Sequence, residues 1–161
     1  MRLAVLVLED EPEVRGALLR DLAPLADSVR LEPAGDVEDA RAALDEVAAD
    51  GDVLAVVLAD HRLPGQSGVD YLVELHEQDR TSMVRKVLVT GQADQDDTIR
   101  AVNEAGLVRY IAKPWDADTL VEVTREQLTD FVIEAGLDPL PHLQALQAER
   151  VLPLLRDRGD T

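Results

Sequence analysis

The chain has 161 residues and contains no cysteine, which excludes disulfide bonds, zinc–thiolate centres and thiol nucleophiles. Its 33 acidic side chains against 16 Lys and Arg give a formal net charge of -17, a field that repels nucleic acid and anionic membranes. The length suits one compact domain, and no direct contact with nucleic acid is expected.

The first apolar segment, residues 3–8, is followed directly by three acids and is too short for a signal peptide. No apolar stretch approaches the roughly 20 residues that a membrane-spanning helix needs. A cytoplasmic protein without a membrane partner is therefore expected.

Charge is distributed unevenly along the chain. Residues 1–134 carry 29 acidic and 13 basic side chains, net -16, whereas residues 135–161 carry four and three, net -1. This shift, near Gly136, predicts a main domain over 1–134 and a C-terminal extension or connector over 135–161.

Apolar runs rich in β-branched residues alternate with segments whose apolar residues recur at helical spacing. The expected strands, in chain order, are residues 3–8, 29–31, 53–59, 86–90 and 107–112. Helices are expected between and after them, over residues 12–22, 37–47, 69–76, 99–105 and about 116–132. The pattern is five βα units.

Regular βα alternation over about 130 residues predicts an α/β fold, with a parallel sheet covered by helices on both faces. Five strands favour the flavodoxin-like, doubly wound (βα)5 arrangement with strand order 2-1-3-4-5. In such sheets ligands bind beyond the carboxyl ends of the strands, between the first and third strands.

Polar side chains follow the expected strands at this edge. Glu9 and Asp10 come after the first strand, Asp60 ends the third, Thr90 ends the fourth and Lys113 follows the fifth. Two like charges 4 Å apart repel by about 4 kcal/mol at an effective dielectric constant near 20, so the acids need a cation. Mg²⁺ prefers oxygen ligands and often binds phosphate oxygens as well. One carboxylate could then attack phosphorus, with the hydroxyl and the lysine pairing with the phosphoryl group.

Four segments, VLVLEDEPEVR, VLADHRLPGQSG, VLVTGQAD and RYIAKPW, resemble in order and spacing the receiver domain of two-component response regulators. The resemblance covers residues 3 to about 132. It implies that Asp60 accepts a phosphoryl group from a histidine kinase or a histidine phosphotransfer protein. It also implies that Glu9, Asp10 and Asp60 hold Mg²⁺ together with the backbone carbonyl of Arg62.

The same resemblance assigns roles on the other side of the expected site. Lys113 would bind a phosphoryl oxygen. Thr90 and Tyr110 would report phosphorylation to the surface formed by the fourth helix, fifth strand and fifth helix, and so control a downstream protein or a fused output domain. The implied class is a signalling domain rather than an enzyme.

Some features depart from the commonest receiver pattern and leave alternatives open. The acid pair is Glu-Asp rather than Asp-Asp, which makes Asp10 the safer direct ligand and allows Glu9 to act through water. One alternative is a receiver-like interaction module that works without phosphorylation, although the intact Asp60, Thr90 and Lys113 argue against it. Another is a phosphatase of the haloacid dehalogenase type, but that family needs a second acid where this chain has Arg62.

Two further parts of the sequence are open to interpretation. His61, His76 and His142 have neither metal-ligand spacing nor an obvious acidic partner, so we interpret all three as non-catalytic. A helix is expected over about residues 139–156, capped by Asp138 and kinked at Pro153. This segment could pack on its own domain, form a homodimer contact or lead to an output domain.

Overall fold

The computed structural model describes residues 1–91, 95–107 and 109–159. Residues 92–94 of the VLVTGQAD segment and Val108 of the expected fifth strand lie outside the described residues. All five strands are parallel and follow the order β2-β1-β3-β4-β5, which confirms the predicted fold class. The strands are β1 (Leu3–Leu8), β2 (Val29–Ala34), β3 (Val53–Ala59), β4 (Arg85–Thr90) and β5 (Arg109–Ala112).

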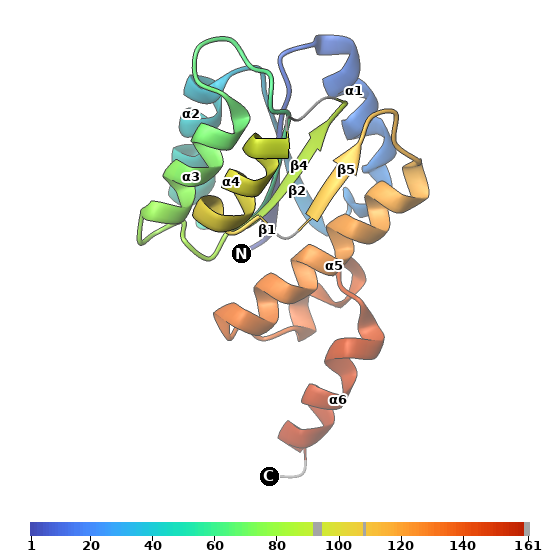
Figure 1. Ribbon diagram of the computed structural model, residues 1–161. Coiled ribbons are helices and arrows are strands. Elements are labelled where there is room, and N and C mark those ends of the chain that lie inside the picture. The colour runs from blue at the N-terminus through green and yellow to red at the C-terminus, as the bar shows by residue number, and fades with distance from the viewer. Residues whose placement is uncertain (92–94, 108, 160–161) are drawn as a thin grey trace.

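Helices cover both faces of the sheet, with α2, α3 and α4 on one side and α1 and α5 on the other (Figure 1). The described helices are α1 (Pro12–Asp21), α2 (Val37–Ala49), α3 (Gly68–Glu77), α4 (Gln95–Ala105), α5 (Ala117–Ala135) and α6 (Ala148–Gly159), with 3₁₀ turns η1 (Ala23–Leu25) and η2 (Leu140–Ala145). The two covered faces explain why the central strands are apolar nearly throughout.

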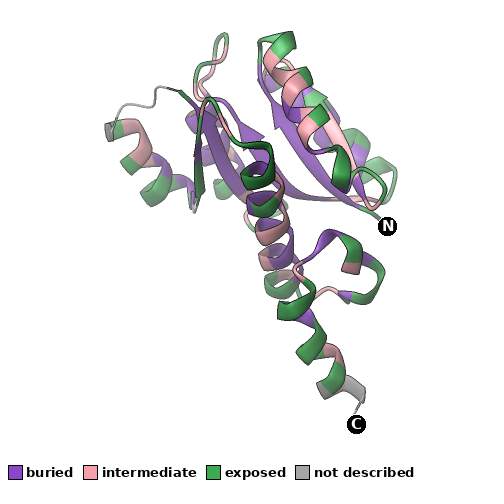
Figure 2. Ribbon diagram, turned by 90° about the vertical axis from the view of Figure 1, so that its right-hand side faces the viewer, coloured by how far each residue is buried: buried purple, intermediate pink, exposed green. Residues whose placement is uncertain are grey.

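Strand β1 shows how the sheet divides the core. All six of its residues are buried, and alternate side chains point to opposite faces. Leu6 and Leu8 pack in the cluster on the α2 and α3 side, whereas Val5 and Val7 pack in the cluster on the α1 and α5 side. Figure 2 shows these central strands as buried and the outer helix faces as exposed.

Side-chain caps fix the starts of three helices, which follow the strands at the carboxyl edge of the sheet. The side chains of Asp36, Ser67 and Asp116 accept the backbone N–H three residues further on at the starts of α2, α3 and α5. At the other end of α5, Gly136 adopts the left-handed conformation with a φ of 69°. The chain therefore turns directly after α5.

Three strand boundaries differ from the sequence prediction, the smallest at β4, which begins one residue early at Arg85. Strand β2 continues to Ala34 and includes Pro33, which an edge strand tolerates because one side of it lacks a neighbour. Strand β5 begins only at Arg109, since Leu107 N still donates to Ala101 O in the turn after α4.

The prediction of one continuous helix over residues 139–156 is wrong. The chain forms η2, becomes extended at Leu146 and then starts α6, which runs through Pro153. Asp138 does accept a backbone N–H, from Leu140, at 3.1 Å. The break coincides with an anchor on α5, because Gln147 N donates to Thr129 Oγ1 at 2.8 Å. Beyond it, α6 projects away from the sheet (Figure 1). A domain boundary between residues 134 and 135 stays a prediction.

Lys86 is a charged side chain buried within β4, with 2% of its surface exposed. Burial lowers the pKa of its ammonium group to about 8, although that group donates to the carbonyls of Val84 and Ser82 at 2.5 and 3.3 Å. The unfolded chain keeps this proton up to the ordinary pKa of 10.5. Between these two pH values the unfolded state binds more protons, so the contribution of Lys86 to stability rises with pH.

We therefore expect Lys86→Met to raise the free energy of unfolding at pH 7 by about 1–3 kcal/mol, because it removes a buried charge. The gain should shrink as the pH approaches 10.5. Urea unfolding of both proteins at pH 7 and at alkaline pH measures the difference. A variant that is less stable than the parent at pH 7 would contradict this prediction.

Candidate functional site

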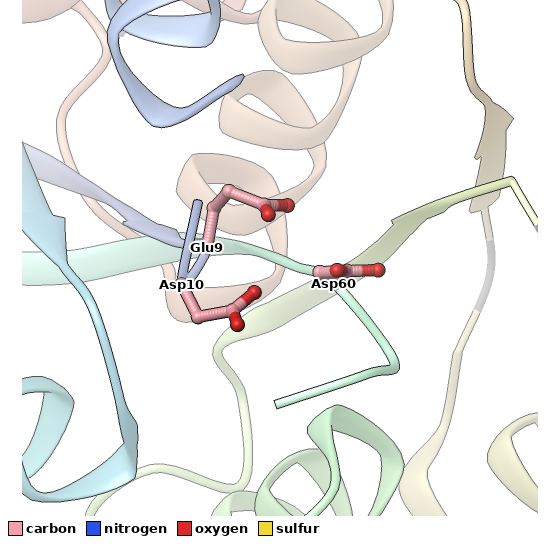
Figure 3. Close-up of side chains that lie close together, drawn as sticks. All are labelled: Glu9, Asp10 and Asp60. Carbon is pink, nitrogen blue, oxygen red and sulfur yellow. The ribbon is translucent and has the colours of Figure 1, made fainter. Parts of the chain in front are cut away.

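Three carboxylates from two neighbouring strands meet at the carboxyl edge of the sheet (Figure 3). Glu9 and Asp10 follow β1, Asp60 follows β3, and one oxygen from each lies within 4.8 Å of the others. Backbone pairing extends to this edge, because Asp60 N donates to Leu8 O and Glu9 N donates to Ala34 O, both at 3.0 Å. The structure thus brings together the three acids that the sequence places at strand ends.

Lys113 enters the same site from the loop after β5. Its Nζ lies 2.7 Å from Glu9 Oε2 and 3.4 Å from Asp60 Oδ2. The lysine therefore pairs most closely with Glu9, which is 1% exposed, and less closely with Asp60. The sequence predicts the lysine at this edge but not its preference for Glu9.

The charges of the three carboxylates and of Lys113 do not balance one another. Burial raises the pKa of Glu9 and the nearby charge of Asp60 adds to this, while the hydrogen bond from Lys113 opposes both. Burial would lower the pKa of Lys113, but the hydrogen bond to Glu9 and the charges of Asp60 and Glu9 raise it overall. Three ionised carboxylates and one ammonium group leave two negative charges, which a divalent cation would neutralise.

The carboxylates differ in how open they are to a metal ion. Glu9 already accepts hydrogen bonds from Lys113 through Oε2 and from the backbone N–H of Glu11 through Oε1, at 2.7 and 3.2 Å. Asp10 is exposed, and Asp60 shares only a longer contact with Lys113. Asp10 and Asp60 are thus the better placed direct ligands, and Glu9 fits a role through water. The backbone carbonyl of Arg62, on the loop after β3, stays a predicted ligand.

Thr90 and Tyr110 lie on adjacent strands beside the acids. Thr90 is 2% exposed at the end of β4, and Tyr110 on β5 is 43% exposed. The Tyr110 hydroxyl donates to the backbone carbonyl of Thr90 at 2.8 Å, and the exposure of Tyr110 shows that its ring lies outward. A direct bond thus joins the two residues that the family resemblance links.

Two features of the loop after β3 are not visible in the sequence pattern. Gly68 packs so closely on the Asp60 backbone that an added Cβ would lie 1.9 Å from the carbonyl oxygen. His61 does have an acidic partner, contrary to our expectation, because its Nε2 lies 3.0 Å from Asp97 Oδ2 on α4. In the sequence, the only indication of the close packing on Asp60 is a glycine at the start of the third helix. Nothing in the sequence indicates the contact between His61 and Asp97.

Comparison with known proteins identifies the family. The model of the response regulator receiver domain matches residues 5–125, and the chain belongs to this family of two-component signalling domains. Its fold is also that of the receiver domain of an HD domain-containing protein from Pseudomonas fluorescens Pf-5, with a TM-score of 0.71 and 27% identity over 84% of this chain and 93% of that one.

Several curated relatives are transcriptional regulatory proteins. The chain is 34% identical over 156 residues to the hydrogenase transcriptional regulatory protein HoxA of Cupriavidus necator, which covers 96% of this chain and 29% of HoxA. It is 35% identical over 143 residues to the transcriptional regulatory protein AruR of Pseudomonas aeruginosa, covering 89% of this chain and 56% of AruR. The chain thus spans less than a third of HoxA and little more than half of AruR.

None of the helices in the described part of the chain combines the length and the apolar composition that a membrane span requires.

Proposed function

We propose that this chain is a phosphoacceptor switch, which takes a phosphoryl group on Asp60 in a Mg²⁺-dependent reaction. The observation that supports this most directly is the convergence of Glu9, Asp10 and Asp60 within 4.8 Å, with Lys113 beside them. A structural cluster of surface acids would not need a buried glutamate paired with a lysine.

Mg²⁺ suits the donor set of the site. Receiver domains bind this ion at an acidic pocket, and the oxygens of Asp10, Asp60 and the Arg62 carbonyl are ligands that it prefers. When bound, Mg²⁺ would offset negative charge on the phosphoryl oxygens. Glu9 would contribute charge and hold water rather than bind the ion directly.

The phosphoryl donor would be a phosphohistidine of a histidine kinase or of a histidine phosphotransfer protein. An oxygen of Asp60 attacks the phosphorus, an O–P bond forms, and the N–P bond of the donor breaks with its electron pair returning to the imidazole. Lys113, 3.4 Å from Asp60, is close enough to pair with a phosphoryl oxygen. Thr90 offers a hydroxyl for a further hydrogen bond.

Phosphorylation would then change the surface formed by α4, β5 and α5. The phosphoryl group carries about -1.5 to -2 charge and strong acceptor oxygens in place of the single charge of the Asp60 carboxylate, and these oxygens favour an inward shift of Thr90. Such a shift would alter the bond from Tyr110 to the Thr90 carbonyl and let the ring turn inward. A downstream protein or an output domain would bind or respond to this changed surface.

The C-terminal extension is the proposed connector to such an output domain, or a homodimer contact. It is fastened to α5, because Arg125 donates to the Gln144 carbonyl at 2.6 Å and Arg150 pairs with Asp130 at 2.7 Å. Its net charge of -1, in a chain of net -17, makes it the part where two copies repel least. Sedimentation of the full chain and of a version ending at Ala135 separates the two roles.

We also propose a cytoplasmic location, where histidine kinases present their phosphohistidine.

Incubation with acetyl phosphate tests the proposed function. We expect one phosphoryl group, stable to acid and labile to base, which peptide mapping places on Asp60 and which Asp60→Asn or chelation of Mg²⁺ abolishes. Continuous turnover of phosphomonoesters would support the phosphatase alternative instead. Equal binding of a partner protein by the parent chain and by Asp60→Asn would support the phosphorylation-independent module.

A further inference from the structure

His61 and Asp97 join the loop between β3 and α3, residues 60–67 and here called the phosphoacceptor loop, to the first turn of α4. The 3.0 Å contact runs from His61 Nε2 to Asp97 Oδ2, and the side chains are 15% and 37% exposed. An ionised carboxylate only accepts hydrogen bonds, so Nε2 carries the proton and donates it. This bond spans 36 residues of sequence and begins one residue after Asp60.

Helix α4 depends on such contacts more than its neighbours do. Among its described side chains, residues 96–105, only Ala101 and Ala105 are buried, each contributing a single methyl group. Ile99 and Val102 are 50% and 52% exposed. With so little apolar area buried, polar contacts supply a large share of what holds α4 in place.

The imidazole of His61 is also incompletely satisfied. Its Nδ1 is buried and has no hydrogen-bond partner among the described residues. A buried polar atom without a partner raises the free energy of the state that contains it. The His61 backbone is held in turn, because its carbonyl accepts a hydrogen bond from Gly68 N at 2.9 Å. The ring therefore has to follow any change in the loop that carries Asp60.

We propose that the His61–Asp97 bond is a positioning contact that makes α4 respond to the chemical state of Asp60. It rests on the proposed function, because it concerns how phosphorylation reaches α4. A loop that rearranges around an aspartyl phosphate moves His61, and Asp97 carries that movement to the first turn of α4. Without the bond, Asp60 would still be phosphorylated, but the movement of its loop would no longer reach α4 through this contact.

Amide hydrogen exchange of the α4 peptides, with and without Mg²⁺ and beryllofluoride, tests the link. In His61→Leu and Asp97→Ala we expect exchange of the α4 amides in the unliganded protein to rise about three- to tenfold, the effect of one lost, partly exposed hydrogen bond to a charged group. The change that beryllofluoride causes in α4 should be lost in both. Asp97→Asn, whose side-chain oxygen still accepts from Nε2, should retain that change.

Arg100→Ala provides the matched control. Arg100 ties α4 to Asp70 on α3 at 2.6 Å, and not to the residue next to Asp60. This variant should loosen α4 in both states and keep the response to beryllofluoride. Unchanged α4 exchange in His61→Leu and Asp97→Ala would overturn the proposal, as would an undiminished response to beryllofluoride. Failure of beryllofluoride to bind the parent chain would count against the proposed function, and the unliganded exchange rates would still decide whether the bond holds α4.

Discussion

Replacing Gly68 with alanine is expected to damage both the stability and the phosphoryl chemistry of this protein. The new Cβ would lie 1.9 Å from the Asp60 carbonyl oxygen and 2.8 Å from its carbon, and both are backbone atoms that cannot rotate away. The loop or the first turn of α3 must therefore shift. We expect the free energy of unfolding to fall by about 2–4 kcal/mol. We also expect phosphorylation at Asp60 to slow about tenfold or more, since small displacements cost reactive geometry.

Gly16→Ala is the control for this variant. Gly16 lies within α1, and an added Cβ would meet nothing within 4 Å. The same chemical change there should raise the free energy of unfolding by about 0.5–1 kcal/mol and leave phosphorylation unchanged. Urea unfolding and the rate of labelling by acetyl phosphate measure both effects. If Gly68→Ala behaves like Gly16→Ala, the close packing of α3 on the Asp60 backbone is not a constraint on the site.

Lys113→Met is expected to have the second large effect. The substitution leaves the carboxylate of Glu9, 1% exposed, beside Asp60 without its ammonium partner. We expect the free energy of unfolding in the absence of Mg²⁺ to fall by about 2–3 kcal/mol at neutral pH, because a buried charge loses its partner. Phosphorylation of Asp60 should also slow strongly, since the ammonium group would no longer pair with the phosphoryl oxygens.

The pH dependence of this variant follows from Glu9. Its pKa is already raised in the folded protein, and loss of the hydrogen bond from Lys113, which lowers it, raises it further. The folded state then binds a proton that the unfolded chain releases, so stability falls as the pH rises above the ordinary value of 4.5. The deficit relative to the parent should be smaller near pH 5 than at pH 8.

A second substitution separates charge from packing. In the double variant Glu9→Gln/Lys113→Met, the uncompensated buried charge is gone, and most of the lost stability should return at pH 8. Urea unfolding of the single and double variants provides this comparison. A double variant no more stable than Lys113→Met would show that an unpaired charge on Glu9 is not the source of the lost stability.

The sequence predicts the parts of this fold that depend on regular patterns. Runs such as residues 53–59 are apolar throughout because helices cover both faces of the sheet, and this composition is visible in one dimension. The meeting of Glu9 with Asp60 is also predictable, because the carboxyl ends of parallel strands lie at one edge.

Contacts that depend on side-chain direction are beyond such reasoning. Lys113 could have paired with Asp60 first, and only the geometry shows the 2.7 Å contact with Glu9. The partner of His61 lies 36 residues away on a different helix, at a distance that no periodicity encodes. The break at Leu146 is not predictable in this way, because helical spacing of leucines continues across it and the anchor from Gln147 to Thr129 exists only in three dimensions.

Crystallography of the chain with beryllofluoride and Mn²⁺, an anomalously scattering substitute for Mg²⁺, would show which oxygens hold the metal ion and the phosphoryl mimic. We expect beryllium bonded to an oxygen of Asp60, and a metal ion held directly by Asp10, Asp60 and the carbonyl of Arg62, at the roughly 2 Å distances of hard-cation oxygen ligands. Lys113 should have turned toward the fluorides. A metal ion bound elsewhere, or beryllofluoride attached to a carboxylate other than Asp60, would contradict this expectation.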